Sequence, residues 1–411
     1  FFCFFAVGLR RGTPAGSLLR MAGTGMATAM KVIRILLLLG LLTALWRAGG
    51  TVAFFVWCGV RLITPGTFVL VAFGLSAVFS LAFGSSFGVA GTAGVILMTI
   101  ARSGGANLIV TAGAIMSGIY VGERLSPASS TAALVSAVSG VDQHEFQMRM
   151  WRTTPVPLLL TLVIYGVLSV LCPIQTVDAH IVAALEEGFS LTWPTALPAA
   201  ALLLLPWLKV SAMASIAVSC MLSAGCALVV QHVSAGELLR ACVLGYRPAL
   251  PALAELMSGG GLISMAGVVV IVILSCAYSG MFSGTGLLDP VTGRLGKLAE
   301  RLGLFGAHVA ASFGCSALFC NQTVAIVMNA QLLKEEYRRR DLPDMELAEN
   351  IGNSTVNLAG LVPWAIAASV PLTALEAGAE ALPLSFYLYL LPLWCWFLSW
   401  RRERSKNRNK V

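Results

Sequence analysis

A charge-free stretch constrains the fold of this chain more than any other feature. From Leu62 to Ile100 the sequence contains no Asp, Glu, Lys or Arg. This run is longer than one membrane-spanning helix, which needs about 20 apolar residues. The whole chain agrees, because 57% of its 411 residues are hydrophobic and only 11% are charged, against about 25% in a typical soluble domain. The sequence therefore predicts an all-α, polytopic transmembrane protein of the cell (inner or plasma) membrane.

The net charge of +8 indicates membrane orientation rather than nucleic-acid binding. Basic residues gather in short loops and in the tail 401–410, which is typical of cytoplasmic flanks. No basic stripe interleaved with aromatic residues is present, so nucleic acid is not an expected partner. We expect a cytoplasmic C-terminus and the lipid bilayer as surroundings, and a homodimer is compatible with the sequence.

The ten cysteines predict neither a metal site nor a cofactor. They lie mostly in apolar runs, none forms a CxxC pair, and no histidine stands at ligand spacing from one. Buried cysteines usually act as small hydrophobic side chains.

Small polar residues interrupt the apolar sequence twice in the first half of the chain. The stretch 84–94 is rich in Gly and Ser, and the stretch 122–140 carries Glu123 beside Arg124. Between Glu123 and Ser136 the second stretch also has five hydroxyl residues: Ser126, Ser129, Ser130, Thr131 and Ser136. Lipid cannot hydrogen-bond a loosened backbone, so non-helical chain at membrane depth is tolerated only where protein or a water-filled cavity covers it. We interpret these stretches as parts of a solute or ion site.

Similar interruptions recur in the second half. The sequence SLAFGSS at 80–86 resembles SALFCNQ at 316–322, and the polar stretch 126–131 has a counterpart at 353–357. Many secondary transporters consist of inverted halves, whose discontinuous helices bind substrate or ion at mid-membrane. We therefore predict two inverted pseudo-repeats that contain broken or re-entrant helices.

This organisation predicts five segments. They are a truncated N-terminal segment (1–30), a first transmembrane repeat half (31–152), connecting transmembrane helices (153–260), a second transmembrane repeat half (261–373), and a last helix with a basic cytoplasmic tail (374–411). The truncation is expected because the chain begins at Phe1 and its first residues resemble the end of a helix.

These motifs resemble the NhaC family of Na+/H+ antiporters, a branch of the ion transporter superfamily. The family's GTSWGT-x-GT-x-G-x-x-LM is similar to 84–98, its GDKMSPLSDTTNL to 122–134, and its GDQYLAIV to 320–327. Its YKEAY resembles 333–337 and its EDSGT…LIPW resembles 352–364, so the resemblance is collinear over residues 35–400. It implies a secondary transporter that works by alternating access and has Na+ and H+ as its transported partners.

The chain departs from this family at acidic positions. The aspartates of the family's SPLSDTT and GDQ motifs are Ser130 and Asn321, and its Glu-Asp pair before SGT is Gly352-Asn353. Only the Asp-Lys pair keeps its charges, as Glu123-Arg124. Cation sites prefer hard oxygen ligands, usually with a carboxylate, and proton exchange needs a titratable group. Two hypotheses follow: Na+/H+ antiport with Na+ held weakly at Ser130, Asn321 and Asn353, or transport of a small polar amino or organic acid with weak or no cation coupling.

The candidate ion- or substrate-binding residues are the polar residues of the interrupted stretches. They are Ser85, Ser86, Glu123, Ser126, Ser129, Ser130, Thr131, Asn321, Gln322, Asn353, Ser354, Thr355 and Asn357. As structural alternatives, the hydroxyls bond back to their own helices and the amides join the two halves. Glu123 is either the remaining proton carrier or the partner of Arg124 in an ion pair at a helix end near the interface; the ion pair is the simpler interpretation.

The sequence 84–88, GSSFG, also fits the GxSxG pattern of serine hydrolases. That pattern needs a strand–turn–helix and a partner base. No strand is predicted before Ser86, and His308, the only histidine expected in a span, is expected to be hydrogen-bonded core. An intramembrane serine hydrolase is thus the third hypothesis, and we expect no catalytic residues and no enzyme.

Overall fold

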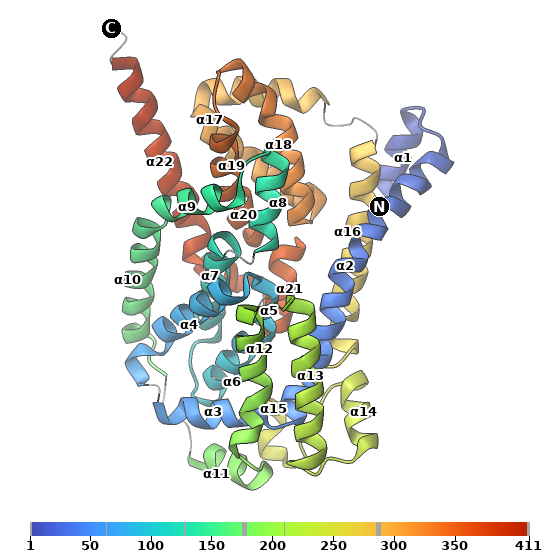
Figure 1. Cartoon of the computed structure of the whole chain (residues 1–411), viewed down its shortest axis with the longest axis vertical. Coiled ribbons are helices and arrows are strands. Elements are labelled where there is room, and N and C mark those ends of the chain that lie inside the picture. Colours follow the sequence, from blue (N-terminus) through green and yellow to red (C-terminus); the bar gives the residue numbers. More distant parts are fainter. Residues whose placement is uncertain are drawn as a thin grey trace.

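Helices make up nearly all of the chain that the computed structural model describes, which is residues 2–62, 64–126, 129–174, 179–208, 210–284 and 289–408 (Figure 1). Within these ranges the only β-type pairing is an isolated bridge between Tyr246 and Gly259. The prediction of an all-α protein is confirmed. Pro127 and Ala128 of the polar stretch and the side chains of the tail residues 402–410 lie outside the described residues.

The helices fall into three runs along the chain. The first contains α1 (Phe2–Arg10), α2 (Ala15–Ala48), α3 (Thr51–Leu62), α4 (Phe68–Phe83), α5 (Ser86–Val89), a π-helical turn (Ala90–Gly94), α6 (Val95–Ser103), α7 (Leu108–Leu125), α8 (Ser130–Ser139) and α9 (Gln143–Thr153). The second contains α10 (Pro155–Leu171), α11 (Ala179–Gly188), α12 (Leu197–Leu204), α13 (Ala212–Val229), α14 (Ala235–Leu244) and α15 (Ala254–Met257). The third contains α16 (Ala266–Gly284), α17 (Asp289–Phe319), α18 (Gln322–Arg339), α19 (Asp344–Asn353), α20 (Thr355–Leu358), α21 (Ile366–Ala374) and α22 (Phe386–Arg408).

Several of these helices are suited to crossing a membrane. Among the described residues, three stretches are long and apolar enough on their own, namely Ser86–Ser103, Leu108–Leu125 and Leu298–Phe319. Three bent helix pairs raise the number to six if each pair crosses as one span. Bends of 51° to 66° separate the members of these pairs, so broken helices are a general feature of the fold.

Helix α7 lies at the centre of the first half, and every residue from Val110 to Leu125 is buried. It packs closely against α4 because glycines face that helix. A Cβ at Gly122 would lie 1.9 Å from the carbonyl carbon of Ser80, and one at Gly118 would lie 2.6 Å from the carbonyl oxygen of Phe73. Small residues let membrane helices approach in this way, and the approach fixes the end of α7 against the end of α4.

Two helix breaks share the same backbone geometry. After α4, Gly84 is left-handed (φ 65°) and Ser85 is extended (φ −141°, ψ 118°). After α17, Cys320 is left-handed (φ 53°) and Asn321 is extended (φ −132°, ψ 118°). In both cases the extended residue caps the next helix through its side-chain oxygen. This match supports the predicted correspondence between 80–86 and 316–322, while the five segment boundaries stay a prediction.

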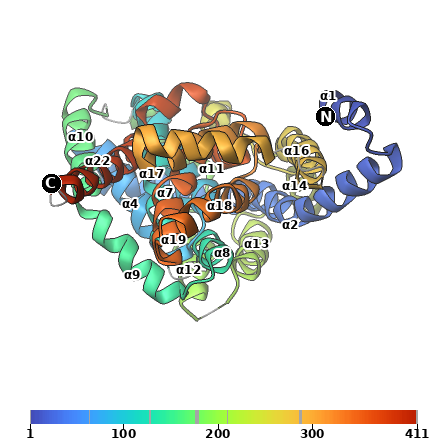
Figure 2. The same ribbon diagram turned by 90° about the horizontal axis from the view of Figure 1, so that it is seen from above.

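The two halves meet where α8 packs against α18 and α19, as seen from above in Figure 2. Helix α20 packs against α7 and α17. The ends of the broken helices from both halves therefore lie in one region of the molecule.

Candidate functional site

Glu123 joins the two helix breaks of the first half. It lies in the last turn of α7 and is only 6% exposed. Its Oε2 accepts a hydrogen bond from the backbone N–H of Ser86 (2.8 Å), and its Oε1 accepts one from the Thr131 hydroxyl (2.6 Å). Ser86 begins the helix after the first break and Thr131 lies in the first turn after the second. The carboxylate therefore sits at a helix N-terminus, where unpaired N–H groups stabilise negative charge.

The predicted serines surround this carboxylate in different ways. Ser129 donates to the Glu123 carbonyl and caps α8 by accepting from the Ala132 N–H (3.1 Å). Ser85 caps α5 by accepting from the Gly88 N–H (3.2 Å). The structural alternative, bonding to the local backbone, is therefore realised at Ser129 and Ser85. Ser130 is exposed at the start of α8.

Arg124 points away from Glu123 into a different set of partners. It is 1% exposed, and its Nη1 donates to the hydroxyls of Thr154 (2.7 Å) and Tyr387 (3.2 Å). Its Nη2 donates to the hydroxyl of Thr153, to the Met150 carbonyl (3.0 Å) and to Asn353 Oδ1 (2.6 Å). No carboxylate contacts this guanidinium within the described part of the chain. The interpretation of Glu123 and Arg124 as an ion pair near the interface is wrong, because both are buried and successive helical residues project in different directions.

The breaks of the second half contain neutral groups. Asn321 caps α18 through Oδ1 and donates from Nδ2 to Cys276 Sγ (3.2 Å). Gln322 donates to the Val356 carbonyl (2.8 Å), which joins the α17–α18 break to α20. Ser354 donates to the Asn350 carbonyl (2.6 Å).

The two remaining predicted amides differ in how their oxygens are used. Asn353 accepts from Arg124 and from the Thr153 hydroxyl (3.1 Å). This argues against the predicted weak Na+ site at Asn353, because the oxygen faces a fixed positive charge. Asn357 donates to the Gly352 carbonyl (3.3 Å), and its buried Oδ1 has no partner among the described residues. Ser126 is also buried, at the end of α7, and its carbonyl accepts from Gln147 (2.9 Å).

A polar cluster in the second half includes residues that the sequence analysis did not single out. The Asn329 amide donates to the hydroxyls of Ser312 (2.9 Å) and Thr355 (2.9 Å), and only Thr355 is a predicted site residue. The buried Asn329 Oδ1 accepts no hydrogen bond from the described residues. The signal that marks Asn329 is an amide within the apolar sequence AIVMNA, since polar groups at membrane depth are costly.

His308 is buried and hydrogen-bonded through Nε2 to the Tyr337 hydroxyl (2.9 Å), as predicted for a core histidine. The GxSxG pattern at 84–88 follows helix α4 rather than a strand. The strand–turn–helix required of a hydrolase is therefore missing there.

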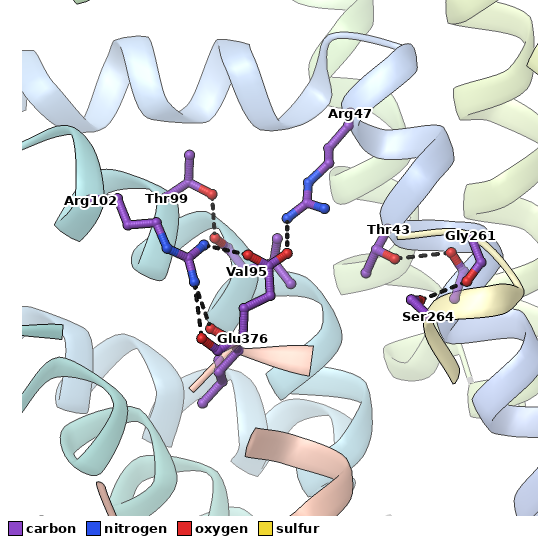
Figure 3. Close-up of polar contacts among 10 residues, drawn as sticks. Thr43, Arg47, Val95, Thr99, Arg102, Gly261, Ser264 and Glu376 are labelled. Carbon is purple, nitrogen blue, oxygen red and sulfur yellow. Dashed lines mark hydrogen bonds and ion pairs between the residues drawn. The ribbon is translucent and has the colours of Figure 1, made fainter. Parts of the chain in front are cut away.

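A separate charge cluster joins three helix ends on the far side of α7. Glu376, which follows α21, receives Arg47 from the end of α2 (Nη2–Oε1 2.8 Å) and Arg102 from the end of α6 (Nη1–Oε2 2.8 Å). Figure 3 shows its carboxylate between the two guanidinium groups. Arg102 also donates to the carbonyls of Leu375 (3.2 Å) and Glu376 (3.3 Å). Arg47 is 2% exposed, whereas Glu376 is 42% exposed, so water reaches one side of the cluster.

Comparison with known proteins gives these features a context. Residues 145–398 match the sequence model of the Na+/H+ antiporter family. The chain belongs to this family. It is 25% identical to the Na+/H+ antiporter NhaC of Bacillus subtilis, with 94% of this chain and 88% of the relative aligned. It is 26% identical to the malate-2H+/Na+-lactate antiporter of the same organism (88% and 79% aligned) and 28% identical to the arginine/ornithine antiporter ArcD of Halobacterium salinarum (81% and 70% aligned).

The membership confirms the predicted resemblance and the predicted function class. The protein is a multi-pass membrane protein and a secondary transporter of a family of Na+/H+ antiporters. Its relatives are transporters rather than enzymes, and they include exchangers named for ions and for organic solutes.

Proposed function

We propose that the protein exchanges Na+ for H+ and that Glu123 is the group to which both bind. The observation that carries this proposal is the position of Glu123. It is the only buried acidic side chain among the described residues, and it bridges both helix breaks of the first half. Unpaired charge in a low-dielectric interior is costly and usually functional. A carboxylate kept there without a basic partner is therefore suited to take up a cation or a proton.

The surroundings of Glu123 suit either occupant. The Thr131 hydroxyl donates to the carboxylate in this structure, and a hydroxyl can rotate to present its lone pairs instead. When H+ neutralises the carboxyl, the hydroxyl accepts or loses that hydrogen bond. When Na+ binds, the carboxylate and the hydroxyl together supply hard oxygen ligands. Because one carboxylate holds one cation or one proton, this site alone predicts electroneutral exchange.

Alternating access needs a contact that separates when one face opens. The Arg47–Glu376–Arg102 cluster links the end of α21 to α2 and α6, so we propose that it closes this face. Glu376→Gln should shift the protein toward the state that is open there. The labelling rate of a cysteine at Thr373, one turn inside the cluster, should then rise; an unchanged rate would contradict the gate.

A second candidate function is the exchange of a small organic acid or amino acid. The observation that favours it is the neutral character of the second half, where Asn321, Asn329 and Asn357 are amides. In addition, Arg124 of the first half has no acidic partner among the described residues. Such groups suit a polar solute better than a cation. Glu123 would then couple solute movement to H+ or Na+.

Proteoliposomes distinguish the two functions. An inward Na+ gradient should move protons out of liposomes that hold the protein and a trapped pH dye, and should move none in empty liposomes. If Na+ moves no protons at any pH while labelled malate, lactate or arginine exchanges across the membrane, the second function replaces the first.

A further inference from the structure

A pocket of about 440 Å³ lies away from the helix breaks. Its walls come from the end of α11, the turn between α13 and α14, helix α14, and the segment 245–253 that follows. These elements gather at the lower end of the molecule, opposite the C-terminus (Figure 1). A volume of several hundred Å³ holds a small molecule or a headgroup rather than a single ion.

The charge that this pocket offers is positive. Arg240 and Arg247 line it, and neither has a hydrogen-bond or ion-pair partner among the described residues. The acidic lining residue, Glu237, caps the start of α14. Its Oε2 accepts hydrogen bonds from the Ser234 hydroxyl (2.8 Å) and from the Ser234 N–H (3.2 Å). Guanidinium groups bind phosphate oxygens through paired N–H donors. The free groups of the pocket are therefore complementary to a phosphate.

The rim of the pocket continues into an apolar surface. Leu244 lines the pocket and is 56% exposed, and on the same helix Leu239 is 70% exposed and Val243 is 41% exposed. On the inner side of α14, Leu238 and Ala241 are buried, and Ala241 also lines the pocket. Arg240 and Leu244 are one helical turn apart and share a face. A ligand with a phosphate in the pocket would thus carry its apolar part along the outer face of α14.

We propose that this pocket binds the headgroup of an anionic phospholipid. Arg240 and Arg247 contact the phosphate, and the acyl chains lie against Leu239, Val243 and Leu244. A soluble anion would leave these apolar side chains without a partner. A zwitterionic lipid would bring its own positive charge into a pocket that already has an excess of it. Basic pockets of membrane proteins commonly select acidic headgroups on these grounds.

Native mass spectrometry of the full chain in detergent tests the proposal. We would titrate phosphatidylglycerol and phosphatidylcholine with matched acyl chains, and inorganic phosphate in a separate arm. We expect phosphatidylglycerol to bind more tightly than phosphatidylcholine. Arg240→Ala/Arg247→Ala should remove most of that preference, weakening phosphatidylglycerol roughly 30-fold, because each basic residue near anionic lipid contributes about a fivefold factor.

Matched variants keep the test decisive. Arg338→Ala/Arg339→Ala removes the same charge from the exposed end of α18 and should leave the preference unchanged. The single changes Arg240→Gln and Arg247→Gln serve if the double variant fails to fold, and each should lose about fivefold. A preference that survives in the pocket variants overturns the proposal. Inorganic phosphate that competes as well as the lipid, or a loss of dimer in place of a loss of lipid, also overturns it.

Discussion

The α4–α5 and α17–α18 breaks have the same backbone and opposite chemistry. Each consists of a left-handed residue followed by an extended capping residue with nearly equal dihedral angles. At the first break, the backbone N–H of Ser86 donates a hydrogen bond to the Glu123 carboxylate. At the second break, the Asn321 amide donates to Cys276 Sγ. The comparison teaches that the scaffold of a break and its charge are specified by different residues. A transporter can therefore change its cargo without changing its fold.

The same contrast applies to the two buried arginines. Arg47 shares the Glu376 carboxylate with Arg102, while Arg124 is surrounded by hydroxyl, carbonyl and amide oxygens. A buried guanidinium without an acidic partner is stabilised by hydrogen bonds to neutral acceptors; both Nη atoms of Arg124 make such bonds, whereas its Nε has no partner among the described residues. The acceptors of the Arg124 hydrogen bonds lie on α9, α19 and α22 and at Thr154, between α9 and α10. Arg124 thus holds the halves together rather than neutralising the cargo.

The largest expected effect comes from removing the Glu123 charge, which distinguishes the α4–α5 break from the α17–α18 break. Glu123→Gln keeps the size of the side chain but cannot bind H+. Its single amide oxygen can still accept from the Ser86 N–H, and its NH2 group can donate to the Thr131 hydroxyl in place of the hydrogen bond that the carboxylate accepts. We expect Na+-driven proton movement in proteoliposomes to fall to the level of empty liposomes. Glu335→Gln, an exposed change on α18, should retain full exchange. Normal exchange by Glu123→Gln would show that another group carries the proton.

A carboxylate can also be added where the second half has an amide. Asn353→Asp places an acid 2.6 Å from Arg124 Nη2. The change replaces a hydrogen bond to a neutral amide oxygen with an ion pair, which we expect to add about 1 kcal/mol. We expect a higher midpoint of thermal unfolding in detergent. Asn357→Asp is the matched control, because its buried Oδ1 has no described partner, so it should lower the midpoint. If both changes lower the unfolding midpoint, an acid beside Arg124 does not stabilise the protein and this prediction is wrong.

Ser130→Asp adds an acid to the first half at the start of α8. The position is exposed, and a negative charge in the first turn of a helix contributes about 0.3–1 kcal/mol. We expect Na+-dependent exchange to rise, because a second oxygen anion would lie near Thr131. Ala137 is also exposed and lies about two helical turns farther along α8. Ala137→Asp should therefore not raise Na+-dependent exchange. Equal responses from the two changes would exclude Ser130 from the ion path.

The smallest effect concerns the shared backbone. Cys320 has φ 53° where Gly84 has φ 65°, and a non-glycine residue in this region costs about 1 kcal/mol. Cys320→Gly should therefore stabilise the protein slightly against thermal unfolding, and Gly84→Ala should destabilise it by a similar amount. If the two changes have the same sign, the breaks are not equivalent.

The positions of the breaks could be predicted from the sequence because they depend on local chemistry. Polar residues and a capping side chain after an apolar helix mark both 80–86 and 316–322, and a glycine marks the first of them. The partners of Glu123 and Arg124 could not be predicted in the same way. They depend on which helices surround the end of α7, and contacts such as Arg124 with Tyr387 join residues far apart in the chain. Sequence spacing alone places the two residues side by side and so favoured an ion pair that the fold does not form.

The cluster around Asn329 was missed for a related reason. Its members lie on α17, α18 and α20, and two of them, Ser312 and Asn329, are isolated polar residues in apolar sequence. No short motif unites them. Only the packing of α17 against α18 and α20 brings their hydroxyl and amide groups together.

The central claim is that Na+ and H+ compete for the Glu123 carboxyl. The most direct test is the number of protons released when Na+ is added to the purified protein in weakly buffered detergent solution, measured with a pH dye over a range of starting pH. We expect added Na+ to release protons from the wild-type chain and to release none from Glu123→Gln. Proton release of equal size from the wild-type chain and from Glu123→Gln would contradict the account.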